Sequence, residues 1–247
     1  MYLSKKHKVI FIRSPRSAGS SVMEFLIENL KDDEAIHTGC EDGNQIADTL
    51  PSSIKKAMIV NGTKPMEIKF MGLDDILAYI NIVDEDNLED YRVFTILRDP
   101  VDRHRSMYNS LKETWSRDIP TMLDEYHYLA GSPGGIASHF KNDTGGSIKV
   151  TDQMSYRGQL YGRVYLLPFL EDHLRDLLED LGLPLVHELP KYKKEENEYS
   201  PLPFDYETIM AMKKYFKNDF NLYSRLRITA DETNKDFYSK TFKRKES

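Results

Sequence analysis

The chain has 247 residues, of which 40% are apolar and 30% are charged, and its formal net charge is −6. This length favours one large domain with its own core, and the negative charge disfavours a general nucleic-acid binder, so any anion site must be a local basic pocket. The single cysteine excludes an intramolecular disulfide and a cysteine-based metal cluster. We find no signal peptide and no apolar run that could span a membrane, so we expect a cytoplasmic protein without a membrane partner.

Apolar runs and helical spacings predict the elements in chain order. The β-branched run at 9–12 predicts a buried strand, and apolar residues at helical spacing from 22 to 30 predict the helix that follows it. We expect residues 1–227 to form one domain and 228–247 to form a loosely held polar tail. Further strands are predicted at 35–38, 56–60, 93–97 and 164–167, and further helices at 41–50, 73–80, 101–111, 122–129, 170–181 and 209–222.

Strands that alternate with helices are typical of a doubly wound parallel sheet. We therefore expect an α/β fold, a P-loop-like three-layer domain with a central parallel sheet of four to five strands flanked by helices. In this architecture, ligands bind at the carboxyl ends of the strands. The loops that matter are then those that follow Ile12, Thr38, Val60, Leu97 and Leu167.

The segment RSPRSAGSS, residues 13–21, connects the first strand to the first helix and carries two arginines among small residues. A strand, a small-residue loop and a helix N-terminus form the geometry in which backbone N–H groups converge on an anion. The segment therefore predicts a cradle for a phosphate or a sulfate group.

The nucleotide-kinase pattern G-x-x-x-x-G-K-[ST] fits this segment poorly. When the two are aligned on Gly19 and Ser21, Ser14 replaces the first glycine and Ser20 replaces the lysine. No acidic residue follows a strand in a position to hold magnesium, because Asp99 is needed for the turn that ends its strand. We expect no metal site, and a P-loop nucleotide or metabolite kinase is the second hypothesis.

Two stretches resemble PAPS-dependent sulfotransferases, in particular the carbohydrate and membrane-type enzymes. PRSAGSS, residues 15–21, resembles their 5′-phosphosulfate loop, roughly P-[KR]-[ST]-[GA]-G-[ST]-[ST]. RDPVDRHRS, residues 98–106, follows a predicted strand and resembles their 3′-phosphate motif, with a serine eight residues after the arginine. The order, spacing and strand–turn–helix setting match, and a less specific likeness covers most of residues 8–227.

The resemblance implies that PAPS is the donor, PAP the product, and a hydroxyl of a carbohydrate or small metabolite the acceptor, without a metal. In this scheme Arg16 stabilises charge on the bridging oxygen as the sulfuryl group leaves. Arg98 binds the 3′-phosphate with its planar fork, together with Ser106. The residues assigned to cofactor binding are Arg13, Pro15, Arg16, Ser17, Ala18, Gly19, Ser20, Ser21, Arg98 and Ser106.

The general base departs from the family pattern. Several relatives have a histidine where this chain has Thr63, and threonine cannot deprotonate an alcohol. His37 and Glu41 are the candidate catalytic bases, because we expect their strand to neighbour the first one and to bring them near the cradle. Lys64 and Glu67 are weaker candidates. A non-catalytic PAP- or nucleotide-binding module, which kept the cradle and lost the base, is the third hypothesis.

The motif at 98–106 also has structural interpretations. Arg98 could be a cap that pairs with Asp99 or Asp102. We expect His104 and Arg105 to lie on a solvated helix face or to contribute to acceptor binding.

Overall fold

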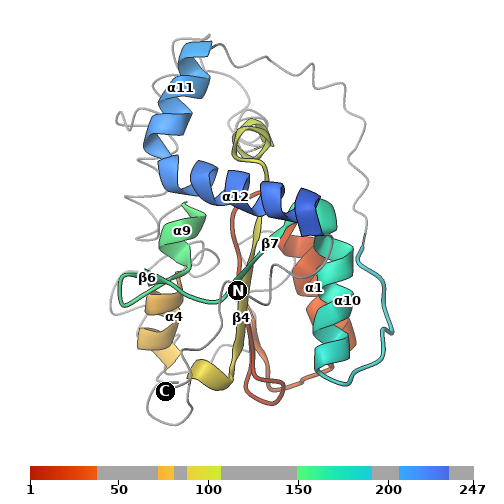
Figure 1. Ribbon diagram of the computed structural model, residues 1–247. Coiled ribbons are helices and arrows are strands. Elements are labelled where there is room, and N and C mark those ends of the chain that lie inside the picture. Colours follow the sequence, from red (N-terminus) through yellow and green to blue (C-terminus); the bar gives the residue numbers. More distant parts are fainter. Residues whose placement is uncertain (38–71, 81–87, 107–148, 191–205, 234–247) are drawn as a thin grey trace, which may run out of the picture.

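The computed structural model describes residues 1–37, 72–80, 88–106, 149–190 and 206–233 (Figure 1). Other predictions lie outside these residues, namely the strand at 56–60, the helices at 41–50 and 122–129, and the side chains of Glu41, Thr63, Lys64 and Glu67.

A five-stranded sheet, in the order β3-β1-β2-β4-β7, lies at the centre of the molecule. Strands β2, β4 and β7 pair in parallel, whereas β1 is antiparallel to both of its neighbours. The sheet is therefore mostly parallel, and the fold is α/β as predicted. The strands are β1 (Tyr2–Ser4), β2 (Val9–Ile12), β3 (Ile36–His37), β4 (Arg92–Leu97) and β7 (Arg163–Leu166).

Strand β1 departs from the prediction, which placed no strand before residue 9. It is only three residues long, too short to show a period, and a short polar connection joins it to β2 as a hairpin. Its insertion separates β3 from β2 by two strand spacings, about 10 Å. The expectation that the strand of His37 neighbours the first predicted strand is therefore wrong.

Helices cover both faces of the sheet and make three layers (Figure 1). Alternate side chains of a strand point to opposite faces, and β2 shows this directly. Val9 and Phe11 pack with helices α1 (Gly19–Leu30) and α10 (Leu170–Asp180). Ile10 and Ile12 belong to the cluster on the other face. That second cluster takes side chains from α4 (Leu73–Ile80), α9 (Val150–Gln153) and α12 (Lys217–Thr233).

The C-terminal part of the chain differs in detail from the prediction. Instead of one helix at 209–222, there are two, α11 (Tyr206–Tyr215) and α12. Helix α12 continues to Thr233, so the predicted boundary at 227 falls inside it. Of the predicted tail, residues 228–233 belong to this helix, and 234–247 lie outside the described residues.

The remaining elements are short. A two-residue turn, Arg157-Gly158, has positive φ at both positions and closes a small hairpin. The hairpin strands are β5 (Ser155–Tyr156) and β6 (Gln159–Leu160), and the 3₁₀ turns are η1 (Leu88–Asp90) and η2 (Leu167–Phe169).

Gly162, just before β7, should be intolerant of any side chain. Its φ is +87°, and a Cβ would lie 2.6 Å from the carbonyl oxygen of Val93. Gly158 has a similar φ, +76°, but open space around it. We predict that Gly158→Ala costs about 1–2 kcal/mol from backbone strain alone, and that Gly162→Ala costs at least ~3 kcal/mol. Urea unfolding of the two variants measures the difference, and equal losses would contradict the close packing of β7 on β4.

Candidate anion-binding site

The cradle loop, residues 13–18, connects β2 to α1 and is held in an unusual backbone conformation. Arg16 and Ala18 both have left-handed φ values, 58° and 57°. Such strain in non-glycine residues costs of order 1–3 kcal/mol each and gathers at binding loops. No side chain caps the N-terminus of α1. The first-turn N–H groups therefore have no side-chain acceptor, which suits them to an anionic ligand.

Arg13 lies beneath the start of α1 and supports it. Its side chain is 6% exposed, and its Nη2 donates a hydrogen bond to Ser20 Oγ at 2.6 Å. A Cβ on Gly19 would lie 2.7 Å from the Arg13 side chain, so only glycine fits there. Because Ser20 Oγ accepts from Arg13, its own O–H is left to donate to a ligand. Arg13 therefore supports the first turn of α1 through Ser20. Its direct contact with a cofactor stays a prediction.

The two predicted motifs meet in space. Arg16 Nε donates a hydrogen bond to Ser106 Oγ at 3.0 Å, across 90 residues of sequence. This contact is possible because β2 and β4 are parallel neighbours, so that the segments after them leave the same edge of the sheet. The structure therefore brings together Arg16 and Ser106, one residue from each motif, although the sequence paired Ser106 with Arg98.

Arg98 contributes a second positive charge close by. Burial lowers its pKa; the carboxylate of Asp102 opposes this, and the charge of Arg16 adds to the lowering. The carboxylate of Asp99 also opposes the lowering of this pKa. In addition, Asp99 caps the helical segment 100–106, since its Oδ1 accepts from the N–H groups of Val101 and Asp102 at 2.9 and 3.1 Å. Two cations held near one another in a partly desolvated place favour an anion between them.

The other predicted loop residues are small and largely enclosed. Ser17 is 1% exposed, and its hydroxyl donates to the carbonyl of Pro15 at 3.5 Å. Ser21 is also buried, on the first turn of α1. The hydroxyl of Ser17 thus supports the loop's own conformation, while the site's charge comes from the arginines.

His37 lies away from the cradle loop. It stands opposite Tyr2 in the register of β1 and β3, and the two rings stack with centroids 6.2 Å apart. Burial lowers the pKa of His37, and the N-terminal amine lowers it further. The imidazole is therefore kept neutral, as a base requires, but β1 stands between its strand and β2. The structure does not bring His37 and Arg16 together.

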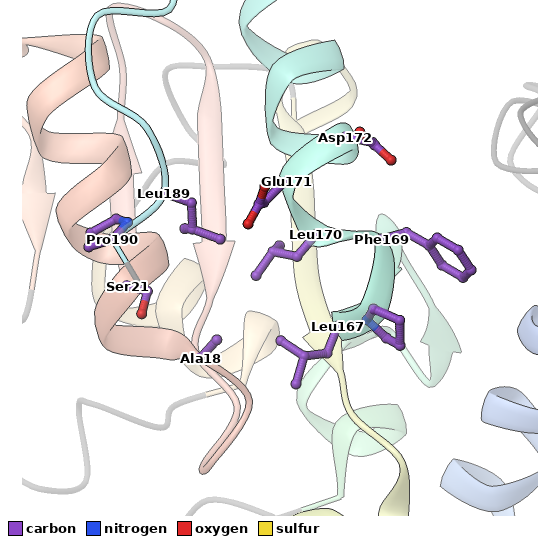
Figure 2. A pocket seen from close by; sticks show the side chains of 10 residues that line it. Ala18, Ser21, Leu167, Phe169, Leu170, Glu171, Asp172, Leu189 and Pro190 are labelled. Carbon is purple, nitrogen blue, oxygen red and sulfur yellow. The ribbon is translucent and has the colours of Figure 1, made fainter. Parts of the chain in front are cut away.

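A cavity of about 510 Å³ opens beside the cradle loop, between the start of α1 and the segment after β7 (Figure 2). Figure 2 shows the Glu171 side chain pointing toward Leu189, whereas Asp172 and Phe169 point the other way. Sequence reasoning named the loop after Leu167 as part of the ligand-binding edge but did not predict a cavity. The lining residues are Ala18, Ser21, Leu167, Pro168, Phe169, Leu170, Glu171, Asp172, Leu189 and Pro190.

A buried ion pair lies behind the site, and sequence reasoning missed it. Arg103 Nη2 and Asp219 Oδ2 are 3.2 Å apart, and both residues are fully buried. His104 is also fully buried and packs against the ring of Phe216 with centroids 4.2 Å apart. The expected solvated face is therefore wrong for His104, although it fits the partly exposed Arg105, which pairs with Asp102. Arg103 and His104 lie in a run of polar residues, and nothing in that run indicates that these two are buried.

Within the described residues, no helix is long and apolar enough to cross a membrane. The same residues contain no group of three or more side chains suited to hold a metal ion. Comparisons of the chain with protein-family models, with curated proteins and with solved structures find no match.

His104 should make the protein sensitive to mild acid. Burial lowers its pKa well below the ordinary value, and the charge of Arg103 lowers it further. In the unfolded chain this histidine binds a proton near pH 6.5, so its contribution to stability is full above about pH 6.5 and falls below it. The added slope is up to ~1.4 kcal/mol per pH unit.

Urea unfolding of the wild type and of His104→Leu, followed from about pH 7.5 down to about pH 5, measures this slope. We predict that the variant loses less stability than the wild type on acidification. Parallel stability curves would contradict the burial of a neutral imidazole.

Proposed function

We propose that the protein is a PAPS-dependent sulfotransferase with a P-loop-like domain, acting on a hydroxyl of a carbohydrate or small metabolite. The observation that carries the proposal is the hydrogen bond between Arg16 and Ser106. One residue belongs to the 5′-phosphosulfate motif and the other to the 3′-phosphate motif. Their contact supports the proposal, because a donor with a 5′-phosphosulfate and a 3′-phosphate needs the two motifs on the same edge of the sheet.

The cradle loop is suited to the 5′-phosphosulfate. The uncapped N-terminus of α1 offers N–H groups, and the Ser20 hydroxyl is oriented by Arg13 to donate. In the reaction, the acceptor oxygen attacks sulfur as the bond from sulfur to the bridging phosphate oxygen breaks. PAP leaves, and the acceptor hydroxyl gives up its proton to a base or to solvent water. Arg16 stabilises the negative charge that develops on the bridging oxygen.

Arg98 is suited to the 3′-phosphate, since it lies near Arg16 and is partly desolvated. The cavity beside Ala18 and Ser21 is suited to the base of the nucleotide. Its lining is about half apolar and half polar, and the carboxylate of Glu171 can accept a hydrogen bond from an exocyclic amino group. Carboxylates repel phosphates, so the charged groups of the donor belong on the arginine side of the loop.

Proton removal sets a limit on the acceptor. His37 stands two strands away from β2, and Glu41 lies outside the described residues. A positioned base typically contributes ~10²–10⁴-fold to such a reaction. A phenolic hydroxyl is more acidic than a sugar hydroxyl and needs less help, so phenols are the second acceptor class to test.

PAP should stabilise the protein without magnesium. A ligand present at 100 times its Kd adds about 2.7 kcal/mol to the free energy of unfolding by mass action. We predict that PAP raises the melting temperature equally with Mg²⁺ and with EDTA, while ATP with Mg²⁺ raises it less. Stabilisation by ATP with Mg²⁺ alone would favour the kinase hypothesis instead.

The two arginines of the site should fail in different ways. Arg98→Ala removes a charged contact remote from the transferring atom, so we predict ~10–100-fold weaker PAP binding. Arg16→Ala removes charge at the reacting centre, so we predict a ~10²–10³-fold lower rate with a smaller loss of affinity. Arg175→Ala, an exposed arginine on α10, is the matched control and should change neither.

Calorimetry with PAP and the rate of PAP release from PAPS in the presence of an acceptor separate affinity from rate. If Arg16→Ala and Arg98→Ala both lose affinity alone, the assigned division of labour is wrong.

A further inference from the structure

We propose that the buried Arg103–Asp219 ion pair is a positioning unit, which sets the spacing between the two halves of the anion site. This inference rests on the proposed function, because it concerns a ligand that carries two anionic groups. Neither Arg103 nor Asp219 is among the residues that we propose to contact the ligand. They act through the segments that they hold.

The carboxylate of Asp219 is fully satisfied inside the protein. Besides Arg103, it accepts hydrogen bonds from the N–H groups of Val150 and Thr151 at 2.9 and 3.0 Å, and from the Thr151 hydroxyl at 2.9 Å. Asp219 sits in the first turn of α12, and Val150 and Thr151 begin α9. The ion pair therefore joins three segments that are far apart in the sequence.

Arg103 carries this connection to the cradle loop. Its Nη1 donates to Ser14 Oγ at 3.5 Å, and Ser14 directly precedes Pro15. Gln153, at the end of α9, donates to the carbonyl of Arg13 at 3.4 Å. Arg13 and Ser14 directly precede the 5′-phosphosulfate loop. Side chains that belong to α9 or contact α12 therefore hold the entrance of that loop.

Arg103 also belongs to the helical segment that carries the other half of the site. It lies between Arg98 and Ser106 in sequence, and its guanidinium lies 5.9 Å from the Phe216 ring. A single side chain therefore fixes the helical segment against α12 and, through Ser14, against the cradle loop. We therefore expect a shift of Arg103 to move Arg98 relative to Arg16.

The energetics favour a positioning role over a purely stabilising one. Taking two charges out of water costs free energy that their attraction only partly returns, and apolar residues of similar volume often stabilise a fold equally well. What an apolar pair cannot supply is a fixed direction, because it lacks hydrogen bonds. A ligand with two phosphates gains from its second contact only when the two sites have the right spacing.

The preference of the protein for PAP over 5′-AMP distinguishes a positioning role from a purely structural one. PAP occupies both halves of the site, whereas 5′-AMP occupies the cradle loop without the 3′-phosphate contact. The ratio of their affinities reports the spacing between the halves. General destabilisation lowers the population of folded protein and weakens both ligands by the same factor.

The experiment measures the Kd of PAP and of 5′-AMP by calorimetry for the wild type and three variants. Arg103→Met/Asp219→Leu replaces the pair with apolar side chains and leaves no buried charge. Arg103→Lys keeps the charge but loses the planar fork that reaches Ser14 and Asp219 together. Leu77→Ala, a buried change on α4 away from both motifs, is the control for destabilisation.

We expect the wild type to prefer PAP by ~100-fold, as a charge-assisted second contact allows. The double variant should lose about tenfold of this preference while its 5′-AMP affinity stays within about twofold, and Arg103→Lys should lose part of it. Leu77→Ala should keep the wild-type ratio.

A wild-type preference that persists in Arg103→Lys and in the double variant overturns this inference and leaves the proposed function standing. The same conclusion follows if Leu77→Ala loses as much of the preference for PAP as the double variant does. If the double variant does not fold, Arg103→Lys decides alone. A wild type that binds neither nucleotide overturns the proposed function, and the inference falls with it.

Discussion

The parallel pairing of β2 with β4 is the constraint on which the site depends. Ile12 and Thr95 are partners in the register, and the buried Thr95 hydroxyl donates to the Ile12 carbonyl at 2.8 Å. This bond fixes the carboxyl ends of the two central strands beside each other. The segments that leave them carry Arg16 and Arg98, so strand pairing in the core determines how far apart the site's charges lie.

The pairing of β2 with β4 also gathers positive charge at one place. The whole chain carries a net charge of −6, yet four arginines gather around the cradle loop. Two of them are used internally, since Arg103 pairs with Asp219 and Arg13 supports Ser20. Arg16 and Arg98 are the two that we propose to contact the ligand. A locally basic site in an acidic protein selects a small anion by geometry rather than polyanions by charge.

Local patterns predicted much of this structure, and non-local pairings escaped prediction. Short stretches of sequence are enough to predict the strands at 9–12 and 93–97 and the motif at 98–106. Periodicity and turn residues act over only a few positions. Strand β1 is too short to show a period, so it was missed. Strand order is not a local property, so His37 was placed too near the cradle. The Arg103–Asp219 pair spans 116 residues, and no local pattern marks it.

A crystal structure of the protein with PAP tests the central claim most directly. We predict that the 5′-phosphate lies over residues 15–21, with the 3′-phosphate on Arg98 and the adenine in the cavity beside Ser21. Phosphates bound elsewhere, or an adenine far from that cavity, would contradict the claim that β2 and β4 present one two-part anion site.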